Sequence, residues 1–490
     1  MKSVLVRGQV GGGCMLRITG AGARLCDGWS RREMMRVGGL GLFGLGLSQA
    51  DLTRARADSD RRQSVLDPAL DPTFGRAKAC IVLFLMGGPP QHSTWDPKPD
   101  APAEVRGPYG PIASKVPGFP VCELMPGLAR VTDKLAILRA MATDDNAHSS
   151  SGYYMMTGRP HAPKNFENAT PGAPNDFPSL GGMAGRFLTE RGGMPAAVRV
   201  PHRIFNTDGT VWPGQDAGFL GRSADPWLLN AVPTSRGMSV SEIALPENLD
   251  AARVAQRRGL LEGLARHQGD WLERDATTRV LDERERQAFA LLSSAKARAA
   301  FDVEKDDPRL VDRYGRSPFG QSVLMARRLV EAGVRLVQVN WYRGADEPMM
   351  NPCWDSHVDE PNRLKNVLVP PWDQAFSALI EDLSARGLID ETLVVSMAEF
   401  GRSPRLDGGA GRGHWGHVFS MAMAGGGVRG GVVHGASDKV GGFPREGRVN
   451  PEDFTATLFH LMGIRGDTEF TDTLGRPIPV SRGEVIRAIL

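Results

Sequence analysis

Acidic and imidazole side chains follow a short apolar segment late in the chain. Residues 392–397 form a β-branched, apolar run, and Glu399 and Arg402 come directly after it. His414 and His417 follow a loop rich in glycine and arginine. Carboxylates and imidazoles are the ligand mixture that borderline divalent ions prefer. The same residues also fit an ion pair between Glu399 and Arg402 beside two hydrogen-bonded histidines, so both interpretations stay open.

A second pair of this kind, Asp355 and His357, falls in the loop after another apolar segment, 334–341. Two residues spaced i and i+2 in an extended segment point their side chains to one side, which suits a shared ion. The alternative is a surface turn. We favour the metal-ligand interpretation, because several acid–imidazole groups are expected at one edge of one sheet.

The segment 143–158 predicts a helix. Its Asp, Asn and Ser residues are typical of a helix start, and Gly158 is typical of a helix end. A helix N-terminus attracts anions, because its free N–H groups and its dipole point outward. We therefore expect His148 and Ser149 where a phosphate or sulfate would bind, unless the cluster is a simple N-cap.

Strands and helices must position these groups. Apolar runs predict strands at 79–86, 135–139, 197–200, 334–341, 392–397 and 421–427, and amphipathic or capped segments predict helices at 319–332, 370–386 and 450–463. This alternation predicts an α/β fold, a doubly wound and mainly parallel sheet with helices on both faces. Ligands of such sheets bind beyond the carboxyl ends of the strands, where these residues fall. Gly87 and Gly88 end the first strand and permit a close backbone approach there.

The N-terminal part of the chain has the features of an export signal. Residues 1–50 contain seven Lys or Arg and two Asp or Glu, and Arg31–Arg32 precede a short, weakly apolar run at 37–47. This pattern predicts a twin-arginine signal, hence a periplasmic or secreted protein that meets the twin-arginine export machinery. A cytosolic N-terminal helix is the alternative, and Met15 is a candidate start. No segment approaches the ~20 apolar residues of a stable membrane span.

The remaining chain divides into a linker and one domain. Residues 51–76 are charged and then proline-rich, 77–490 form the α/β domain, and 251–300 predict a charged helical insertion within it. Beyond residue 50 the chain has 52 basic and 54 acidic residues, from totals of 59 and 56, so we expect no nucleic-acid partner. No CxxC motif is present, which excludes a thiolate metal cage built on one.

Taken together, these segments resemble an exported bacterial family, domain of unknown function 1501, which is related to sulfatases and alkaline phosphatases. The resemblance covers roughly residues 30–490 and rests on His148 to Arg159, Trp354 to His357, Glu399 to Arg402 and Gly413 to His417. It implies one or two divalent ions beside a nucleophile. Met156 to Arg159 resembles the sulfatase Leu-Thr-Gly-Arg sequence, which implies an anion-binding role for Arg159 and places His148 at the nucleophile position.

The resemblance also implies departures from the family pattern. Glu399 stands where those enzymes have Asp, and Gly87–Gly88 stand where the first strand usually ends in Asp. One metal site is then either lost or rebuilt from Gln91, His92 and His148.

Two functions follow as hypotheses. The first is a metal-dependent hydrolase of phosphate or sulfate esters, acting on a small-molecule or polysaccharide ester. A divalent ion (Zn, Ca and Mg are not distinguished) would be bound by Asp355, His357, Glu399 and His414 or His417. His148 would be nucleophile, base or ligand, Ser149 the alternative nucleophile, and Arg159 or Arg402 the anion site. The second is a secreted binding or structural module that keeps the fold without catalysis.

Overall fold

The computed structural model describes residues 71–490 except 234–237, most of 241–293, and 345, 346 and 348–350. Within 241–293 only residues 253, 256, 257, 259, 260, 263, 285–289 and 291 are described. The expected signal within 1–50, most of the linker and most of the helical insertion therefore lie outside the described residues.

The compact unit begins at Pro72, somewhat earlier than the expected domain start at 77. The reason is contact with the end of helix α14 (Pro451–Leu461). The Gly75 N–H donates to the carbonyl of His460 at 3.0 Å, and the Ala77 N–H donates to that of Leu461 at 2.9 Å. These bonds tie the last residues of the predicted linker to the domain.

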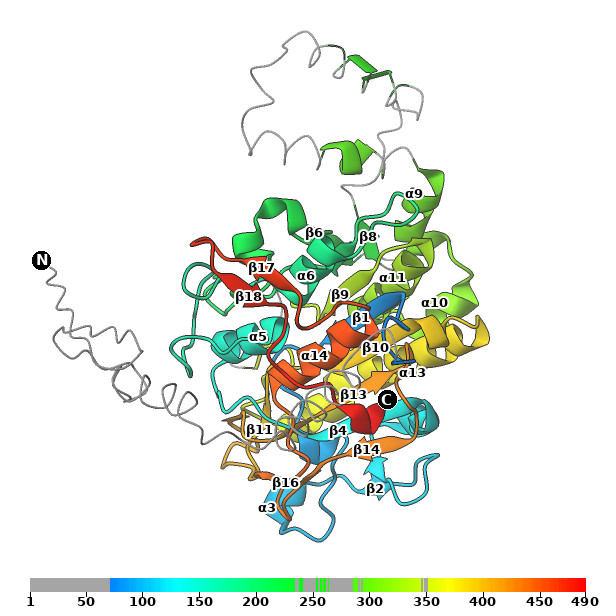
Figure 1. Cartoon of the computed structure of the whole chain (residues 1–490). Helices are drawn as coiled ribbons and strands as arrows, with labels where there is room; N and C mark the ends of the chain where they lie inside the picture. The colour runs from blue at the N-terminus through cyan, green and yellow to red at the C-terminus, as the bar shows by residue number, and fades with distance from the viewer. Residues whose placement is uncertain are drawn as a thin grey trace, which may run out of the picture. The chain divides into compact units, whose positions relative to one another are not determined.

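An eight-stranded sheet forms the centre of the domain (Figure 1). The order across the sheet is β14-β4-β13-β10-β1-β9-β5-β6. Its strands are β1 (Ala79–Phe84), β4 (Leu135–Met141), β5 (Ala197–Val200), β6 (Trp227–Leu228), β9 (Leu336–Asn340), β10 (Thr392–Met397), β13 (Phe419–Ala424) and β14 (Val432–His434). Every residue of β1 and β10 is buried, as expected for central strands covered on both faces.

Helices cover both faces of this sheet. The main ones are α5 (His148–Thr157), α6 (Leu180–Phe187), α10 (Pro308–Tyr314), α11 (Pro318–Ala332), α13 (Val369–Ala385) and α14. Shorter helices are α3 (Ala103–Arg106), α4 (Pro126–Ala129), α9 (Ala295–Phe301) and α12 (Glu360–Arg363), and a π-helix spans Leu364–Leu368. Two-stranded pairs are β2 (Pro111–Ile112) with β3 (Val121–Cys122), β7 (Ala231–Pro233) with β8 (Met238–Val240), β11 (Gly401–Arg402) with β12 (His414–Trp415), β15 (Ala436–Ser437) with β16 (Pro444–Glu446), and β17 (Glu469–Thr471) with β18 (Pro477–Pro479).

The strand register shows which helices face which side. An indole N–H of α13 donates to Ser396 of β10, and Ser396 lies opposite Leu83 of β1. Gln338 of β9, which contacts a methionine sulfur of α5, lies opposite Val82. Consecutive residues of a strand point to opposite faces, so α13 and α5 pack on opposite sides of the sheet. Figure 1 shows α10 and α11 on the side of α13, and α6 and α14 on the side of α5. The expected doubly wound α/β fold is confirmed.

One edge of the sheet collects the loops that carry the predicted site. Strands β1, β4, β9 and β10 run in one direction, and β13 is antiparallel to both of its neighbours. The carboxyl ends of the first four therefore meet the beginning of β13. Glu399 follows β10, Asp355 follows β9, His148 follows β4, and His414 precedes β13.

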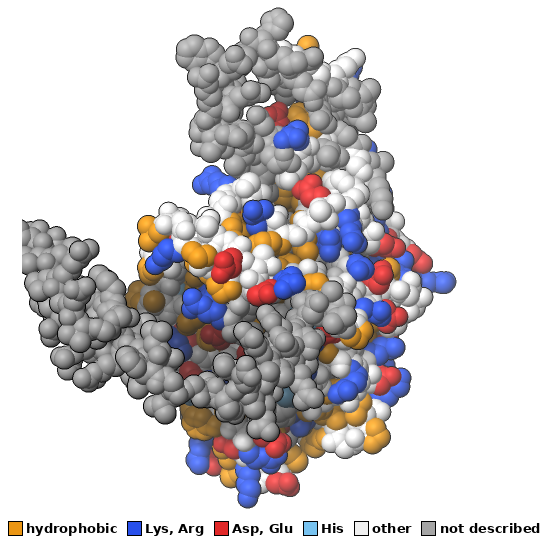
Figure 2. Space-filling model, viewed as in Figure 1, with side chains coloured by type: hydrophobic (Ala, Val, Ile, Leu, Met, Phe, Trp, Pro, Cys, Tyr) orange, Lys and Arg blue, Asp and Glu red, His pale blue; other side chains and the backbone are white. Residues whose placement is uncertain are grey.

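The surface charges and the cysteines of the described residues do not indicate a particular function. Figure 2 shows basic and acidic side chains interspersed on one face of the described chain. No described helix has the length and apolar character needed to cross a bilayer. Cys80, Cys122 and Cys353 are buried and unpaired.

Candidate metal centre

Helix α5 places His148 at the rim of the sheet. The Asp145 carboxylate accepts the Ala147 N–H at 3.0 Å and the Ser150 hydroxyl at 2.8 Å, which organises the first turn. The helix ends at Gly158 with φ of +65°, and a Cβ there would lie 2.2 Å from the Thr455 hydroxyl of α14. The expected helix end is confirmed, and a glycine is required there both for its dihedral angle and for this close contact. The start differs from the expectation, since the helix begins at His148 and its N-cap, Ala147, makes no side-chain capping hydrogen bond.

The Asp355 loop approaches the end of β1 closely enough to require glycine there. Gly87 has φ of +111°, and a Cβ on it would lie 2.2 Å from the Asp355 backbone nitrogen. The close backbone approach expected at Gly87 is therefore made by this loop. The Gly87 N–H donates to Glu399 Oε1 at 2.8 Å. The end of β1 therefore contacts both the residue that follows β10 and the Asp355 loop.

His414 is held against the loop that precedes α5. Its Nδ1 lies 2.8 Å from the Asn146 carbonyl oxygen, and the Gly416 N–H donates to the Asn146 side chain at 2.6 Å. The Gly416 carbonyl in turn accepts the N–H groups of Thr143 and Asp144. These bonds fix the β12 turn beside His148.

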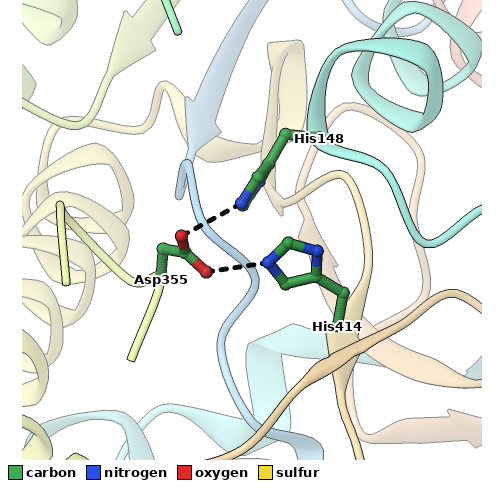
Figure 3. A group of neighbouring side chains, drawn as sticks. All are labelled: His148, Asp355 and His414. Atoms are coloured by element: carbon green, nitrogen blue, oxygen red, sulfur yellow. Dashed lines mark hydrogen bonds and ion pairs between the residues drawn. The ribbon is translucent and has the colours of Figure 1, made fainter. Parts of the chain in front are cut away.

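The three side chains meet around one carboxylate. Asp355 directs one oxygen to each ring (Figure 3): Oδ2 lies 3.1 Å from His148 Nε2, and Oδ1 lies 3.1 Å from His414 Nε2. The ligand atoms of His148, Asp355 and His414 all lie within 4.8 Å of one another. His357 joins them, with Nε2 2.9 Å from Asp355 Oδ1 and 3.0 Å from His414 Nε2. Four of the residues predicted from sequence thus form one cluster, which we call the imidazole cluster.

Glu399 is close to the cluster but acts through His148. Its Oε1 lies 2.7 Å from His148 Nδ1, and the side chain is fully buried. A carboxylate on the second nitrogen of an imidazole is typical of histidines that bind metals. Glu399 therefore lies behind His148, whereas the sequence led us to expect it among the metal ligands.

The charges of the cluster are strongly coupled. Burial alone would lower the pKa of His148, but the Asp355 and Glu399 carboxylates outweigh it and raise that pKa to about 10. Burial would raise the pKa of Asp355, yet His148 and Arg402 hold it well below its usual range. Burial and the neighbouring His148 charge lower the pKa of His414 to about 4.

The donor set fits a cation. His148 Nδ1 and His414 Nδ1 each face an oxygen that can only accept, Glu399 or the Asn146 carbonyl, so each Nδ1 carries a proton. In the neutral rings both Nε2 atoms then present lone pairs to the Asp355 carboxylate. Acceptors that face acceptors at about 3 Å need a positive charge between them, either an added proton or a metal ion.

Arg402 is a buried neighbour of the imidazole cluster that contacts Asp355. Its side chain is fully buried and donates to the carbonyls of Gly87, Gly88, Trp354 and Arg412 as well as to Asp355 Oδ1 at 2.5 Å. Each of the three guanidinium nitrogens donates to at least one group of this set. Arg402 therefore fixes Asp355 in place, and its complete burial keeps it away from a substrate anion.

Three predicted metal ligands lie outside the cluster. Gln91 donates to the carbonyls of Arg402 and Gly441, and its oxygen accepts the Arg402 N–H. His92 is buried with Nε2 2.9 Å from the Val440 carbonyl, and burial lowers its pKa to about 3. His417 lies beyond the Gly416 turn, 3.4 Å from Asp144 and beside the rings of Trp415 and Phe443.

Two residues predicted for catalysis are also engaged elsewhere. The Ser149 hydroxyl donates to the Phe166 carbonyl at 3.1 Å and accepts the Ala169 N–H at 2.9 Å. Arg159 donates to the Pro479 carbonyl at 2.7 Å and lies over a phenylalanine ring. Neither side chain is brought to the cluster, because Ser149 is held by the loop of Phe166 and Ala169 and Arg159 lies beyond the C-terminal end of α5.

A cleft beside the cluster contains residues that the sequence did not reveal. It has about 60 Å³ of free space and is lined by His148 and Asp355 together with Glu167, Trp212 and Arg343. The Glu167 carboxylate accepts the His148 N–H at 2.8 Å, and burial raises its pKa. Arg343 donates to the Phe205 carbonyl and to Thr207, which uses two of its five N–H groups. These residues lie in irregular loops, where no periodic pattern points to a site.

The chain matches one protein family over most of its length. Residues 77–490 match the model described as "Protein of unknown function (DUF1501)", and the chain belongs to this family. No curated protein shows a significant sequence match to it.

Several solved structures have a similar course of the chain. The PsFucS1 sulfatase from Pseudoalteromonas sp. is 12% identical with a TM-score of 0.39, over 83% of this chain and 72% of that one. A protein in the alkaline phosphatase superfamily from Vibrio parahaemolyticus is 12% identical with a TM-score of 0.32, over 81% of this chain and 71% of that one. The phosphonate monoester hydrolase SpPMH from Silicibacter pomeroyi is 11% identical with a TM-score of 0.30, over 84% of this chain and 76% of that one.

Proposed function

We propose that this protein is a metal-dependent hydrolase of phosphate or sulfate esters, with the ion held by His148, Asp355, His414 and His357. One observation carries the proposal: two imidazoles are each fixed by an acceptor at Nδ1 and direct Nε2 to the same carboxylate. Nitrogen donors with one carboxylate suit zinc better than calcium or magnesium, which prefer oxygen. A bound divalent ion would supply Lewis acidity and lower the pKa of a bound water.

The chain's own residues have distinct roles in this proposal. Glu399 and the Asn146 carbonyl hold the rings of His148 and His414, and Arg402 keeps Asp355 ionised. Arg343, at the cleft wall, binds charged oxygens of the ester. Glu167 transfers the proton between water and the leaving oxygen, since its raised pKa brings it closer to neutral pH. The substrate is a small-molecule or polysaccharide ester.

The metal and the activity are tested together on the full-length protein. We expect elemental analysis to find bound zinc, and His414→Ala to lose both the metal and hydrolysis on a panel of phosphate and sulfate esters. His434→Ala, at a histidine of β14 outside the cluster, is the matched control and should keep both. A metal-free protein after reconstitution, or full hydrolysis by His414→Ala, would overturn the proposal.

Export is a separate part of the proposal. Arg31–Arg32 and the weakly apolar run that follows support twin-arginine transport to the periplasm or beyond. Replacement of both arginines by lysine should leave the protein in the cytoplasm, as fractionation would show. Unchanged export of that variant would contradict this part without affecting the site.

A second candidate function is a metal-binding module without catalysis. The observation that favours it is the Ser149 hydroxyl, which is committed to the loop of Phe166 and Ala169 and leaves no serine nucleophile there. Stoichiometric metal without turnover of any ester in the panel would support this function over the first.

A further inference from the structure

Two residues that the sequence suggested as metal ligands, Gln91 and His92, instead hold the loop that joins β15 to β16. This loop spans residues 438–443. Gln91, His92 and Trp415 each contact one of its carbonyl oxygens, at 3.0, 2.9 and 2.6 Å. Gln91 and His92 are both only 1% exposed, so these contacts attach the loop to the interior of the domain.

The same loop is also fixed by its own hydrogen bonds. The Asp438 carboxylate accepts three N–H groups of the loop at 2.8 to 3.1 Å, including that of Phe443. The Asp438 N–H donates to the Phe443 carbonyl at 2.9 Å. A loop with so many internal and external bonds presents its side chains in one arrangement.

Aromatic and apolar side chains of this region are exposed in spite of these bonds. Phe443 is 53% exposed and Val440 38%. The centroid of the Phe443 ring lies 5.7 Å from that of Trp415 and 5.3 Å from that of His417. We call Trp415, His417, Val440 and Phe443 the aromatic patch. A rigid, exposed ring is suited to binding, because little conformational freedom is lost when a ligand covers it.

The size and the polar border of the patch indicate its ligand. A completely buried aromatic side chain covers about 150–250 Å², so these partly exposed rings offer less than the roughly 800 Å² per partner of a stable protein complex. Asp144 and Arg448, 41% and 43% exposed, border the patch next to His417. A sugar ring fits such a surface, because its apolar C–H face stacks on an aromatic face and its hydroxyl groups reach polar neighbours.

The patch is connected to the imidazole cluster through two short segments. Trp415 directly follows His414 in β12. His417 lies 3.4 Å from Asp144, which precedes His148 by four residues, a chain length of at most about 14 Å.

We propose that the aromatic patch binds a sugar ring of a polysaccharide, and that an ester on a nearby unit of the same polysaccharide then lies at the imidazole cluster. Only the position of the ester rests on the proposed hydrolase function. The binding of the polysaccharide does not depend on it.

Binding is measured by electrophoresis of the full-length protein through native gels that contain dextran, xylan or a galactan, each with and without sulfate groups. We expect at least one polysaccharide to retard the wild-type protein. Phe443→Leu keeps an apolar side chain but removes the aromatic face, and it should weaken binding by about two- to tenfold. Phe443→Tyr keeps the ring and should bind like the wild type. The position is exposed, so the fold should be retained.

The control removes an exposed apolar side chain elsewhere. Leu474, 74% exposed, lies in the turn between β17 and β18, and Leu474→Ser should bind like the wild type. The proposal is overturned if no gel retards the wild-type protein, or if Phe443→Leu is retarded as strongly as Leu474→Ser. It is also overturned if sedimentation shows a wild-type dimer that Phe443→Leu abolishes, because the patch is then an interface between copies.

Kinetics test the position of the ester separately. Phe443→Leu should raise the KM for the sulfated polysaccharide relative to the KM for a small aryl sulfate. An equal change in both KM values would contradict the placement of the ester beside the patch. Retardation in the gel without hydrolysis of any ester would overturn the proposed function and leave the sugar site in place.

Discussion

Metal binding to the imidazole cluster should release a proton, and His148 supplies it. Without an ion, the flanking carboxylates raise the pKa of His148 to about 10, so the ring is protonated at pH 7.5. An ion at Nε2 must displace that proton, because Nδ1 donates to Glu399. His414, whose pKa is lowered to about 4, is already neutral and releases none. We therefore expect close to one proton from His148 for each bound ion.

The number of protons released determines how steeply the metal affinity depends on pH. Each released proton makes the apparent association constant rise about tenfold per pH unit, so affinity should increase about a hundredfold between pH 7 and pH 9. Calorimetry in buffers of different ionisation enthalpy counts the protons, and competition with a chelator measures the affinity. Equal affinities at the two pH values, with no proton released, would refute the assignment of His148 as a ligand.

The pH dependence of the free energy of unfolding of the metal-free protein gives an independent test of the raised His148 pKa. A histidine whose pKa is raised on folding stabilises the protein below its unfolded pKa, and this stabilisation disappears as pH rises through the folded pKa. The free energy of unfolding should therefore fall between about pH 6.5 and about pH 10 in the metal-free protein. Glu399→Gln should weaken this fall, and it should reduce metal affinity by about 10- to 100-fold.

Three substitutions test the supporting residues. Arg402→Gln leaves the buried Asp355 without its guanidinium and should lower the free energy of unfolding by about 3–5 kcal/mol, measured by urea denaturation, with loss of metal affinity. Gly87→Ala places a Cβ against the Asp355 loop and strains a positive φ, which should cost at least about 1–3 kcal/mol and weaken metal binding, followed by chelator competition. Ser149→Ala should keep its kcat on any ester that the protein hydrolyses, and lose only about 1 kcal/mol of stability with its hydrogen bond to the Phe166 carbonyl.

Matched variants separate these effects from general destabilisation. Arg412→Gln breaks another buried pair, with Glu360 at 2.8 Å, and should lose stability while its intrinsic metal affinity stays the same. Gly118→Ala strains a φ of +78° in open space and should not change metal binding. If either control loses metal as its partner variant does, the specific roles of Arg402 and Gly87 are wrong. A Ser149→Ala variant without turnover would restore serine as the nucleophile.

The local sequence pattern was sufficient to predict the strands and the helix that position the site. The apolar runs predicted β1, β5 and β10, and the Ser and Asn cluster with Gly158 predicted α5, because strand burial and helix termini depend on neighbouring residues. The reversed direction of β13 was not predicted, since its sequence reads the same in either direction. It matters, because it brings His414 to the edge where the other strands end.

The residue types of the cluster, and the edge of the sheet where His148, Asp355, His357 and His414 gather, could be predicted from the amino-acid sequence. Parallel strands end at one edge, so their following loops meet there whatever the detailed packing. Which donor atoms lie next to one another became clear from the folded structure alone. Hydrogen bonds between distant segments direct His414 inward, send His417 beyond the Gly416 turn, and set Glu399 behind His148. Those choices depend on contacts across hundreds of residues, which no local pattern contains.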